Sequence, residues 1–226
     1  MALALCLSAC APGGEIPSAP TQEPAITAAP TPAPTEAPTQ APIEVGDPKV
    51  EANLAAMMPV LDSIVRTMGV NSGAVYEPRD ADFFWSVLYL MGTNWGQTHP
   101  LVEDAGSHSI VRRQVMQEFA SAAFLDYSDL LDLPAELIDA GAVTYDKGLD
   151  AYLVAHSDMG ASYTRLDDYT VNADGSVEAV VGLYIEPDEY AGSLSFTLAP
   201  NPYADGITDP VYLYSVSAAR DITPAA

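Results

Sequence analysis

The stretch YTRLDDYTVNADGSVEAVVGLYI, residues 163–185, decides the class of fold. Its centre, Asn172-Ala173-Asp174-Gly175, is a turn sequence, and a segment rich in β-branched and aromatic residues flanks it on each side. In residues 177–185 the odd-numbered positions are all apolar, and they alternate with Glu178, Val180, Gly182 and Tyr184. This pattern is typical of a strand with one face in the core and one face closer to water. The two segments are therefore expected to form an antiparallel hairpin.

The rest of the chain after Gly141 continues this β pattern. A second hairpin is predicted around Asp146-Lys147-Gly148, between residues 143–145 and 151–155. Residues 194–198 repeat the alternation, and residues 211–217 are expected to supply the last strand. Together these segments predict an antiparallel meander.

The sequence before Gly141 has helical periodicity instead. Asp47-Pro48 can cap and start a helix whose apolar residues recur at helical spacing up to Gly69. Because Pro59 lies inside this pattern, the helix is expected to be kinked or to be two short helices. Further helical patterns cover residues 80–92, 109–124 and 134–138.

This order of elements predicts an α+β fold, with N-terminal helices packed on one face of a C-terminal antiparallel meander sheet. Residues 49–223 are expected to form a single domain, a length at which a chain can bury its own core. The order resembles that of cystatin-like and NTF2-like domains, in which helices pack on a curved sheet.

The charge of the chain is strongly negative, with 31 Asp and Glu against 8 Lys and Arg. Five of the acids precede Lys49 and all eight basic residues lie at or after it, so the domain carries 26 acids and a formal charge of −18. Such a field repels phosphate backbones and anionic lipid head groups, which argues against a nucleic-acid partner. Acidity of this kind also keeps an exported protein soluble.

Both cysteines, Cys6 and Cys10, lie within the first ten residues. The tetrapeptide Leu7-Ser8-Ala9-Cys10 resembles the lipobox of bacterial lipoprotein signal peptides. The resemblance implies that the Cys10 thiol is lipid-modified, that the peptide before it is removed, and that the mature chain is anchored on the extracytoplasmic face of the cell membrane. Residues 1–10 lack the basic start and long apolar stretch of an export signal, so they are interpreted as a truncated lipoprotein signal peptide. The alternative is a cytoplasmic protein in which this tetrapeptide occurs by chance.

Residues 11–48 are rich in Pro, Thr and Ala, with ten prolines and no aromatic residue. Such a composition cannot bury a core, and closely spaced prolines favour extended backbone. The segment is predicted to be a disordered tether that holds the domain away from the membrane.

Several common chemistries leave no signature in the sequence. It contains no Gly-x-Ser-x-Gly elbow, no Gly-x-Gly-x-x-Gly and no Walker loop, and the domain has no cysteine for thiol catalysis or thiolate zinc sites. No cofactor is therefore predicted, and no catalytic residue is assigned.

The best local constellation is the run from His99 to His108, in which two histidines flank Glu103 and Asp104. Imidazole and carboxylate are competent metal ligands, so His99, Glu103 and His108 are weak candidates for a metal site. Pro100 and Gly106 interrupt any regular helix, and the alternative is an exposed polar loop.

Tyr212 and Tyr214 are two residues apart and are expected to share a sheet face, with Tyr184 as a possible third member. Exposed aromatic ladders stack on sugars or peptides, whereas covered ones belong to the core. The core, or a half-buried sheet face, is the favoured interpretation.

By elimination, the sequence predicts a membrane-anchored lipoprotein whose domain is a ligand-binding or protein-interaction module for an unidentified envelope partner. The alternative is a small cell-envelope hydrolase or metal-dependent enzyme with a pocket between its helices and sheet.

Overall fold

The computed structural model describes residues 47–158, 160–204 and 210–224. The predicted signal peptide, Cys10 and the tether up to residue 46 lie outside the described residues. Among those that are described, no helix combines the length and the apolar character needed to cross a bilayer.

The chain begins with two helices, α1 and α2, and the residues that cap them are those that the sequence predicts. The Asp47 carboxylate accepts a hydrogen bond from the Lys49 amide at 2.8 Å, and Asp80 accepts one from the Phe83 amide at 2.9 Å. The α-helices are α1 (Pro48–Met68), α2 (Ala81–Leu90), α3 (Arg113–Ala123) and α4 (Ala135–Asp139), and α2 continues into a π-helix (Met91–Trp95) and a 3-10 turn (Gly96–Thr98).

The strands form two separate four-stranded antiparallel sheets, which we call the small sheet and the meander sheet. The small sheet has the order β1-β2-β4-β3, from β1 (Glu103–Asp104), β2 (His108–Arg112), β3 (Val143–Asp146) and β4 (Ala151–Ala155). The meander sheet follows the chain order, from β5 (Ser162–Val171), β6 (Val177–Ile185), β7 (Glu189–Pro200) and β8 (Tyr214–Asp221).

The predicted hairpin at residues 163–185 is confirmed and forms one half of the meander sheet, in which β5 pairs with β6. Cross-strand pairs of buried side chains continue onto the next strand: Val177 lies opposite Leu198, Ala179 opposite Phe196, and Val181 opposite Leu194. This apolar face of the sheet is covered by helices, as predicted.

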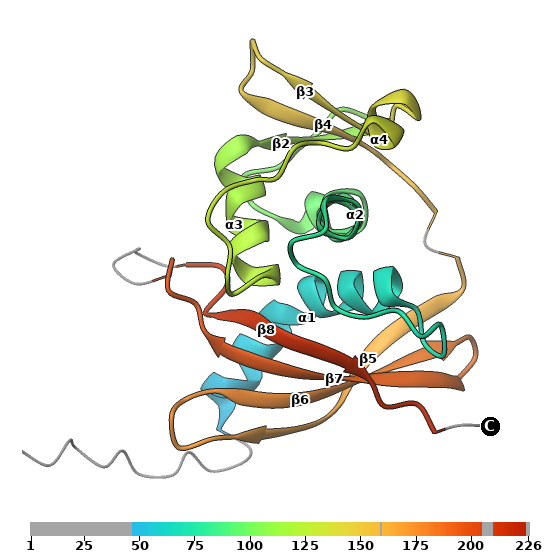
Figure 1. Ribbon diagram of the computed structural model, residues 1–226, viewed down its shortest axis with the longest axis vertical. Helices are drawn as coiled ribbons and strands as arrows, with labels where there is room; N and C mark the ends of the chain where they lie inside the picture. Colours follow the sequence, from blue (N-terminus) through green and yellow to red (C-terminus); the bar gives the residue numbers. More distant parts are fainter. Residues whose placement is uncertain (1–46, 159, 205–209, 225–226) are drawn as a thin grey trace, which may run out of the picture. The chain divides into compact units, whose positions relative to one another are not determined.

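Figure 1 shows α1 lying between the meander sheet on one side and α2 and α3 on the other, with the small sheet beyond them. Helix α1 contacts β5 and β6, and α3 contacts β8 as well as β2 and β4. The fold is therefore α+β, with N-terminal helices followed by a C-terminal antiparallel meander. The core runs from the meander sheet through the helices and includes Leu54, Leu61, Trp85, Phe119, Phe124 and Phe196.

Three predicted details differ from the structure. The hairpin of β3 and β4 belongs to the small sheet and does not extend the meander. The predicted helix at residues 109–124 begins only at Arg113, because Ile110 and Val111 pair with Leu153 and Tyr152 of β4. The last strand begins at Tyr214 and not at residue 211, since its pairing with β7 starts at Pro200.

Helix α1 also decides between two predicted alternatives. It is one helix of 21 residues with Pro59 inside it, so the prediction of two short helices is wrong. Four residues after the proline, the Ser63 hydroxyl donates a hydrogen bond to the Pro59 carbonyl at 2.8 Å.

Candidate functional site

A cavity of about 640 Å³ opens beside α3, and one face of that helix forms its wall. Val115, Met116 and Phe119 turn into the core, whereas the opposite face carries a polar stripe. The stripe has the spacing i, i+3, i+4, i+7, which places its members side by side on a helix. It consists of Gln114, Gln117, Glu118 and Ser121.

The other walls come from three connecting segments. Residues 99–101 follow the 3-10 turn, and Tyr127 and Ser128 follow α3. Residues 201, 203, 204 and 210–212 belong to the connection from β7 to β8. Residues 205–209 of that connection lie outside the described residues. Because β8 starts only at Tyr214, Val211 and Tyr212 are part of the cavity wall and not of the sheet.

Asn201, which is buried, fixes the β7–β8 connection against α3. Its side-chain amide nitrogen donates to the Tyr212 carbonyl at 3.2 Å and lies 3.4 Å from the Ser121 hydroxyl. Its amide oxygen accepts from the Tyr203 amide at 3.0 Å. The wall at this point is therefore held by hydrogen bonds before any ligand arrives.

Three tyrosine rings line the cavity. Tyr127 and Tyr203 meet edge to face with centroids 5.5 Å apart, and the Tyr203 hydroxyl donates to the Tyr127 carbonyl at 2.7 Å. Tyr203 is 44% exposed, and Leu101 at the same cavity is 61% exposed. Large apolar surfaces that stay in contact with water beside a cavity are typical of a ligand site.

Tyr212 is the buried member of the three and also belongs to the core. Burial, and secondly the charge of Glu118, raise the pKa of its hydroxyl above the usual value. Burial raises the pKa of Tyr127 to about 12, with the charge of Asp129 as the second cause. Both rings therefore stay neutral at physiological pH.

His99 is the one predicted metal candidate that lines the cavity. Its ring is almost fully buried and packs edge to face on Phe119 at 5.4 Å. The Leu101 amide donates to Nδ1 at 3.2 Å, so the neutral ring carries its proton on Nε2. Nε2 lies 3.5 Å from a carboxylate oxygen of Glu118 but makes no hydrogen bond among the described residues.

Unpartnered buried atoms of this kind are rare in folded proteins. Among the described residues, the buried side-chain atoms without a hydrogen-bond partner are Nε2 of His99 and the two amide atoms of Asn94. Of these two residues only His99 lines the cavity. An oxygen of a bound molecule could accept a hydrogen bond from Nε2.

The other two metal candidates are engaged elsewhere. Glu103, in β1, lies 3.3 Å from a guanidinium nitrogen of Arg112, and Nδ1 of His108 lies 2.8 Å from the Ser107 hydroxyl. The structure does not bring them together with His99. Within the described part of the chain, no group of three or more His, Cys, Asp or Glu side chains is arranged to hold a metal ion.

The predicted tyrosine ladder is divided between two places. Tyr212 and Tyr214 are both buried in the core, in agreement with the favoured interpretation. Tyr184 is not with them: it stacks on Tyr163 with centroids 5.5 Å apart and carries the Arg165 guanidinium over its ring.

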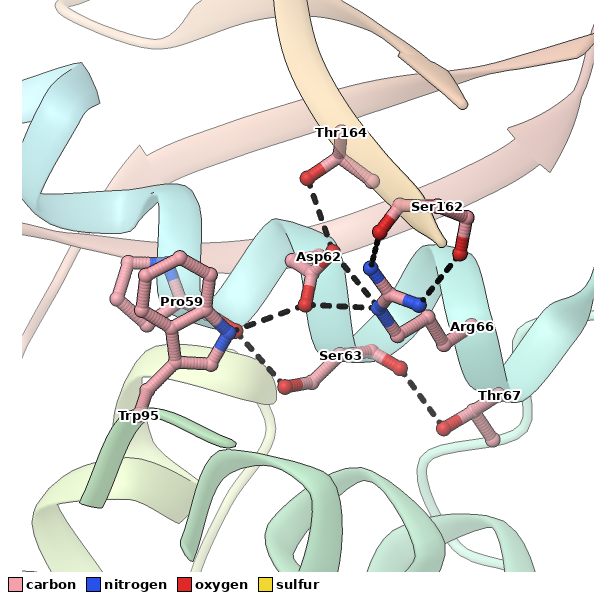
Figure 2. Close-up of polar contacts among 8 residues, drawn as sticks. All are labelled: Pro59, Asp62, Ser63, Arg66, Thr67, Trp95, Ser162 and Thr164. Carbon is pink, nitrogen blue, oxygen red and sulfur yellow. Dashed lines mark hydrogen bonds and ion pairs between the residues drawn. The ribbon is translucent and has the colours of Figure 1, made fainter. Parts of the chain in front are cut away.

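A second polar cluster lies away from the cavity, around the fully buried Asp62 of α1 (Figure 2). Arg66 donates through Nε to both carboxylate oxygens, at 2.9 and 3.0 Å. Thr164 of β5 donates to Oδ1 at 2.9 Å, and Trp95 of the π-helix donates to Oδ2 at 3.0 Å. Arg66 in turn donates to the hydroxyl and the carbonyl of Ser162, each at 3.0 Å.

Three donors of the chain itself thus satisfy both oxygens of Asp62, with the Nε proton of Arg66 shared between them. The cluster joins α1, the π-helix and β5. We therefore assign it a role in holding the fold, and we assign the candidate site to the cavity.

Fold and site define an α+β domain with a preformed cavity between a helix and the connection of two sheet strands. Comparison with protein-family models gives no match, and comparisons with curated proteins and with solved structures give no significant match. The resemblance to cystatin-like and NTF2-like domains stays a prediction.

Sequence reasoning missed Glu118, Tyr127, Tyr203 and Asn201 as members of the site. The polar stripe at residues 114, 117, 118 and 121 was a usable signal, because one face of an otherwise apolar helix pattern carries amide, carboxylate and hydroxyl groups. No local signal connects this stripe with Tyr203, which lies more than eighty residues further along the chain.

Proposed function

We propose that this chain is a membrane-anchored extracytoplasmic lipoprotein whose domain binds a small organic ligand in the cavity beside α3. One observation supports the binding role above all others. A preformed cavity of about 640 Å³ combines three tyrosines with a buried histidine nitrogen that has no hydrogen-bond partner in the described part of the chain. This volume falls within the range of small-molecule sites, and the mixture of apolar walls with a few fixed polar groups is typical of them.

The binding role is tested by filling the cavity. Gln117→Trp projects a large ring from the half-buried face of α3 into the space that a ligand needs. A panel of cationic, neutral and anionic small molecules is screened against the domain by ligand-induced thermal shift. We expect at least one class of ligand to stabilise the wild-type domain and to have no effect on Gln117→Trp.

A pair of tyrosine variants provides the matched control. Tyr203→Ala removes a cavity ring that is 44% exposed, and Tyr190→Ala removes a ring of similar exposure, 47%, from outside the cavity. Binding should weaken by about fivefold in the first variant and stay unchanged in the second. Equal behaviour of the two variants would rule out the cavity as the binding site.

The anchor is supported by the lipobox at Leu7-Ser8-Ala9-Cys10 and by the proline-rich segment that follows it. The test is intact-mass analysis of the membrane fraction from a bacterial host, with the gene's upstream sequence included. A lipid-sized mass increment on a chain that starts at Cys10 should disappear in Cys10→Ala and persist in Cys6→Ala. An unmodified chain that retains Met1 would disprove the lipoprotein assignment.

A small envelope hydrolase is the second candidate function, and one observation favours it. His99 and Glu118 place an imidazole and a carboxylate 3.5 Å apart at one cavity wall, an arrangement that suits general acid–base chemistry. The test is hydrolysis of p-nitrophenyl esters and glycosides by wild type and His99→Gln. Turnover that depends on His99 would establish the enzyme, and equal background rates would reject it.

A further inference from the structure

We infer that the ligand of this cavity is a small organic ammonium ion that carries a hydroxyl or carbonyl oxygen close to its charge. The inference rests on the proposed binding function and names the class of ligand.

The charge of the cavity wall is the first argument. Among the described residues that line it, Glu118 is the only carboxylate, and no lysine or arginine is present. The Glu118 side chain is 30% exposed, so it is partly withdrawn from water. At such a site the Coulomb interaction with a nearby unit charge is screened less than it is in bulk water. A cation is therefore attracted to Glu118, and an anion is repelled.

The charge of the whole domain acts in the same direction. The part of the chain from Lys49 onward carries a formal charge of −18. A negative field of this size raises the local concentration of cations at the surface and lowers that of anions. An anionic ligand would therefore be opposed both by Glu118 and by the long-range field.

The aromatic wall is the second argument. Tyr127, Tyr203 and Tyr212 present rings to the cavity. Aromatic faces attract organic cations through the ring quadrupole, and groups of such rings are the usual receptors of quaternary ammonium ions. Burial raises the pKa of Tyr127 and of Tyr212, so their hydroxyls stay protonated and the attraction comes from the rings and not from a phenolate charge.

His99 supplies the third argument and specifies the rest of the ligand. Its Nε2 proton is a buried donor without a hydrogen-bond partner among the described residues, and it lies 3.5 Å from the carboxylate that would hold the cation. A ligand oxygen that accepts this proton must therefore lie within a few bond lengths of the ammonium group. Choline is the simplest probe with both features.

The first experiment compares choline with 3,3-dimethylbutan-1-ol, a neutral molecule of the same shape, by isothermal titration calorimetry on the full domain. We expect choline to bind at least about tenfold more tightly, because only choline interacts with Glu118 and the rings as a cation. Equal or tighter binding of the alcohol would overturn the inference.

The second experiment removes the charge of the wall and keeps its shape. Glu118→Gln should raise the Kd for choline by about tenfold and leave the Kd for the neutral alcohol unchanged. The matched control is Glu136→Gln, which removes the same charge from an exposed position of α4 outside the cavity. An equal loss of choline affinity in both variants would show that only the net negative charge of the domain attracts the cation, and would contradict the role of Glu118.

The third experiment tests the acceptor oxygen. Tetramethylammonium keeps the charge and lacks the hydroxyl, so we expect it to bind several-fold more weakly than choline to the wild-type domain. In His99→Phe, which keeps a ring on Phe119 and removes the donor, the two ions should bind alike. If choline still binds more tightly than tetramethylammonium to this variant, His99 does not donate the hydrogen bond to the choline oxygen.

The outcomes also separate this inference from the function on which it rests. If a neutral or anionic ligand binds, and Gln117→Trp abolishes its binding, the ammonium assignment fails and the binding function stands. If no ligand of any class is sensitive to Gln117→Trp, both fail together.

Discussion

The Asp62 cluster and the cavity beside α3 each contain a carboxylate near a positively charged or protonated nitrogen. Only in the Asp62 cluster does that nitrogen donate a hydrogen bond to the carboxylate. Both oxygens of Asp62 accept hydrogen bonds, from Arg66, Thr164 and Trp95. In the cavity, Nε2 of His99 lies 3.5 Å from Glu118 and forms no hydrogen bond with any residue that the structure describes.

This difference separates a structural role from a binding role. A polar cluster whose buried groups all have hydrogen-bond partners within the chain contributes to stability. A buried group without such a partner lowers the stability of the free protein, and a ligand that forms the missing hydrogen bond restores it. Changes at Asp62 should therefore affect folding, and changes at the cavity should affect binding.

The largest effect is expected from Asp62→Ala. The substitution leaves Arg66 without its carboxylate and leaves the Trp95 and Thr164 donors unpaired, which should lower the free energy of unfolding by about 3–5 kcal/mol. Urea or guanidinium unfolding measures this change.

The control for that variant is Asp167→Ala, in β5. Asp167 also accepts from an arginine and from a second side chain, namely Arg165 at 2.9 Å and Tyr184 at 2.9 Å, but its side chain is 23% exposed and that of Arg165 is 55% exposed. A loss below about 1 kcal/mol is expected there. Losses of equal size in the two variants would show that burial of Asp62 is not what makes its cluster important.

A smaller effect is expected from Thr164→Val, which removes one donor to Asp62 and keeps the shape of the side chain. Loss of a hydrogen bond to a buried charge should lower stability by about 1.5–3 kcal/mol. The matched variant is Thr197→Val, because Thr197 also lies on a strand and donates to a carboxylate, the half-buried Glu178, at 3.0 Å. We expect less than about 1 kcal/mol in that case. The reverse order would show that the burial of Asp62 does not strengthen its hydrogen bond with Thr164.

The next prediction concerns alkaline pH and Tyr212. Burial, followed by the charge of Glu118, raises the pKa of this hydroxyl in the folded chain, whereas an unfolded tyrosine titrates near pH 10. Above about pH 10 the unfolded chain releases the proton and the folded chain keeps it, so the contribution to stability that is present at lower pH is lost as the pH rises.

Tyr212→Phe cannot release that proton, and its stability should therefore fall less steeply than that of wild type between about pH 9 and pH 11. Urea unfolding at several pH values measures the slope. Part of the slope should remain, since burial also raises the pKa of Tyr76 in the core. Identical slopes in the two proteins would mean that Tyr212 is not shielded from water as the structure places it.

The smallest effect on folding is expected from Glu118→Gln. Its carboxylate has no saturated set of donors to lose, so the free energy of unfolding should change by less than about 0.5 kcal/mol. The same variant is expected to lose about tenfold in choline affinity. A destabilisation comparable to that of Asp62→Ala would show that Glu118 stabilises the fold as Asp62 does, and would contradict its assignment to ligand binding.

Much of the fold could be predicted from the sequence because its signals are local. The turn Asn172-Ala173-Asp174-Gly175 and the alternation after it define a hairpin, and Asp47 and Asp80 define helix starts. The division into two sheets could not be predicted, because it depends on which distant strands pair. Ile110 and Val111 fit a helix pattern as well as a strand until β4 is in place.

The site was harder to predict from the sequence, because it too depends on contacts between segments that are far apart in the chain. His99 was singled out together with its sequence neighbours Glu103 and His108, yet the carboxylate that lies near it is Glu118, one helix further along. Tyr203 reaches the cavity only because β7 carries the chain back to α3. Proximity in the sequence is a poor guide to a site built from four separate segments.

The most direct test of the binding role is an NMR titration of the isotopically labelled domain with the panel of cationic, neutral and anionic small molecules. The account predicts that a cationic member shifts the resonances of His99, Tyr127 and Tyr203, including the Nε2 proton of His99, and that Gln117→Trp abolishes these shifts. No perturbation by any member, or perturbations confined to residues outside the cavity, would contradict it.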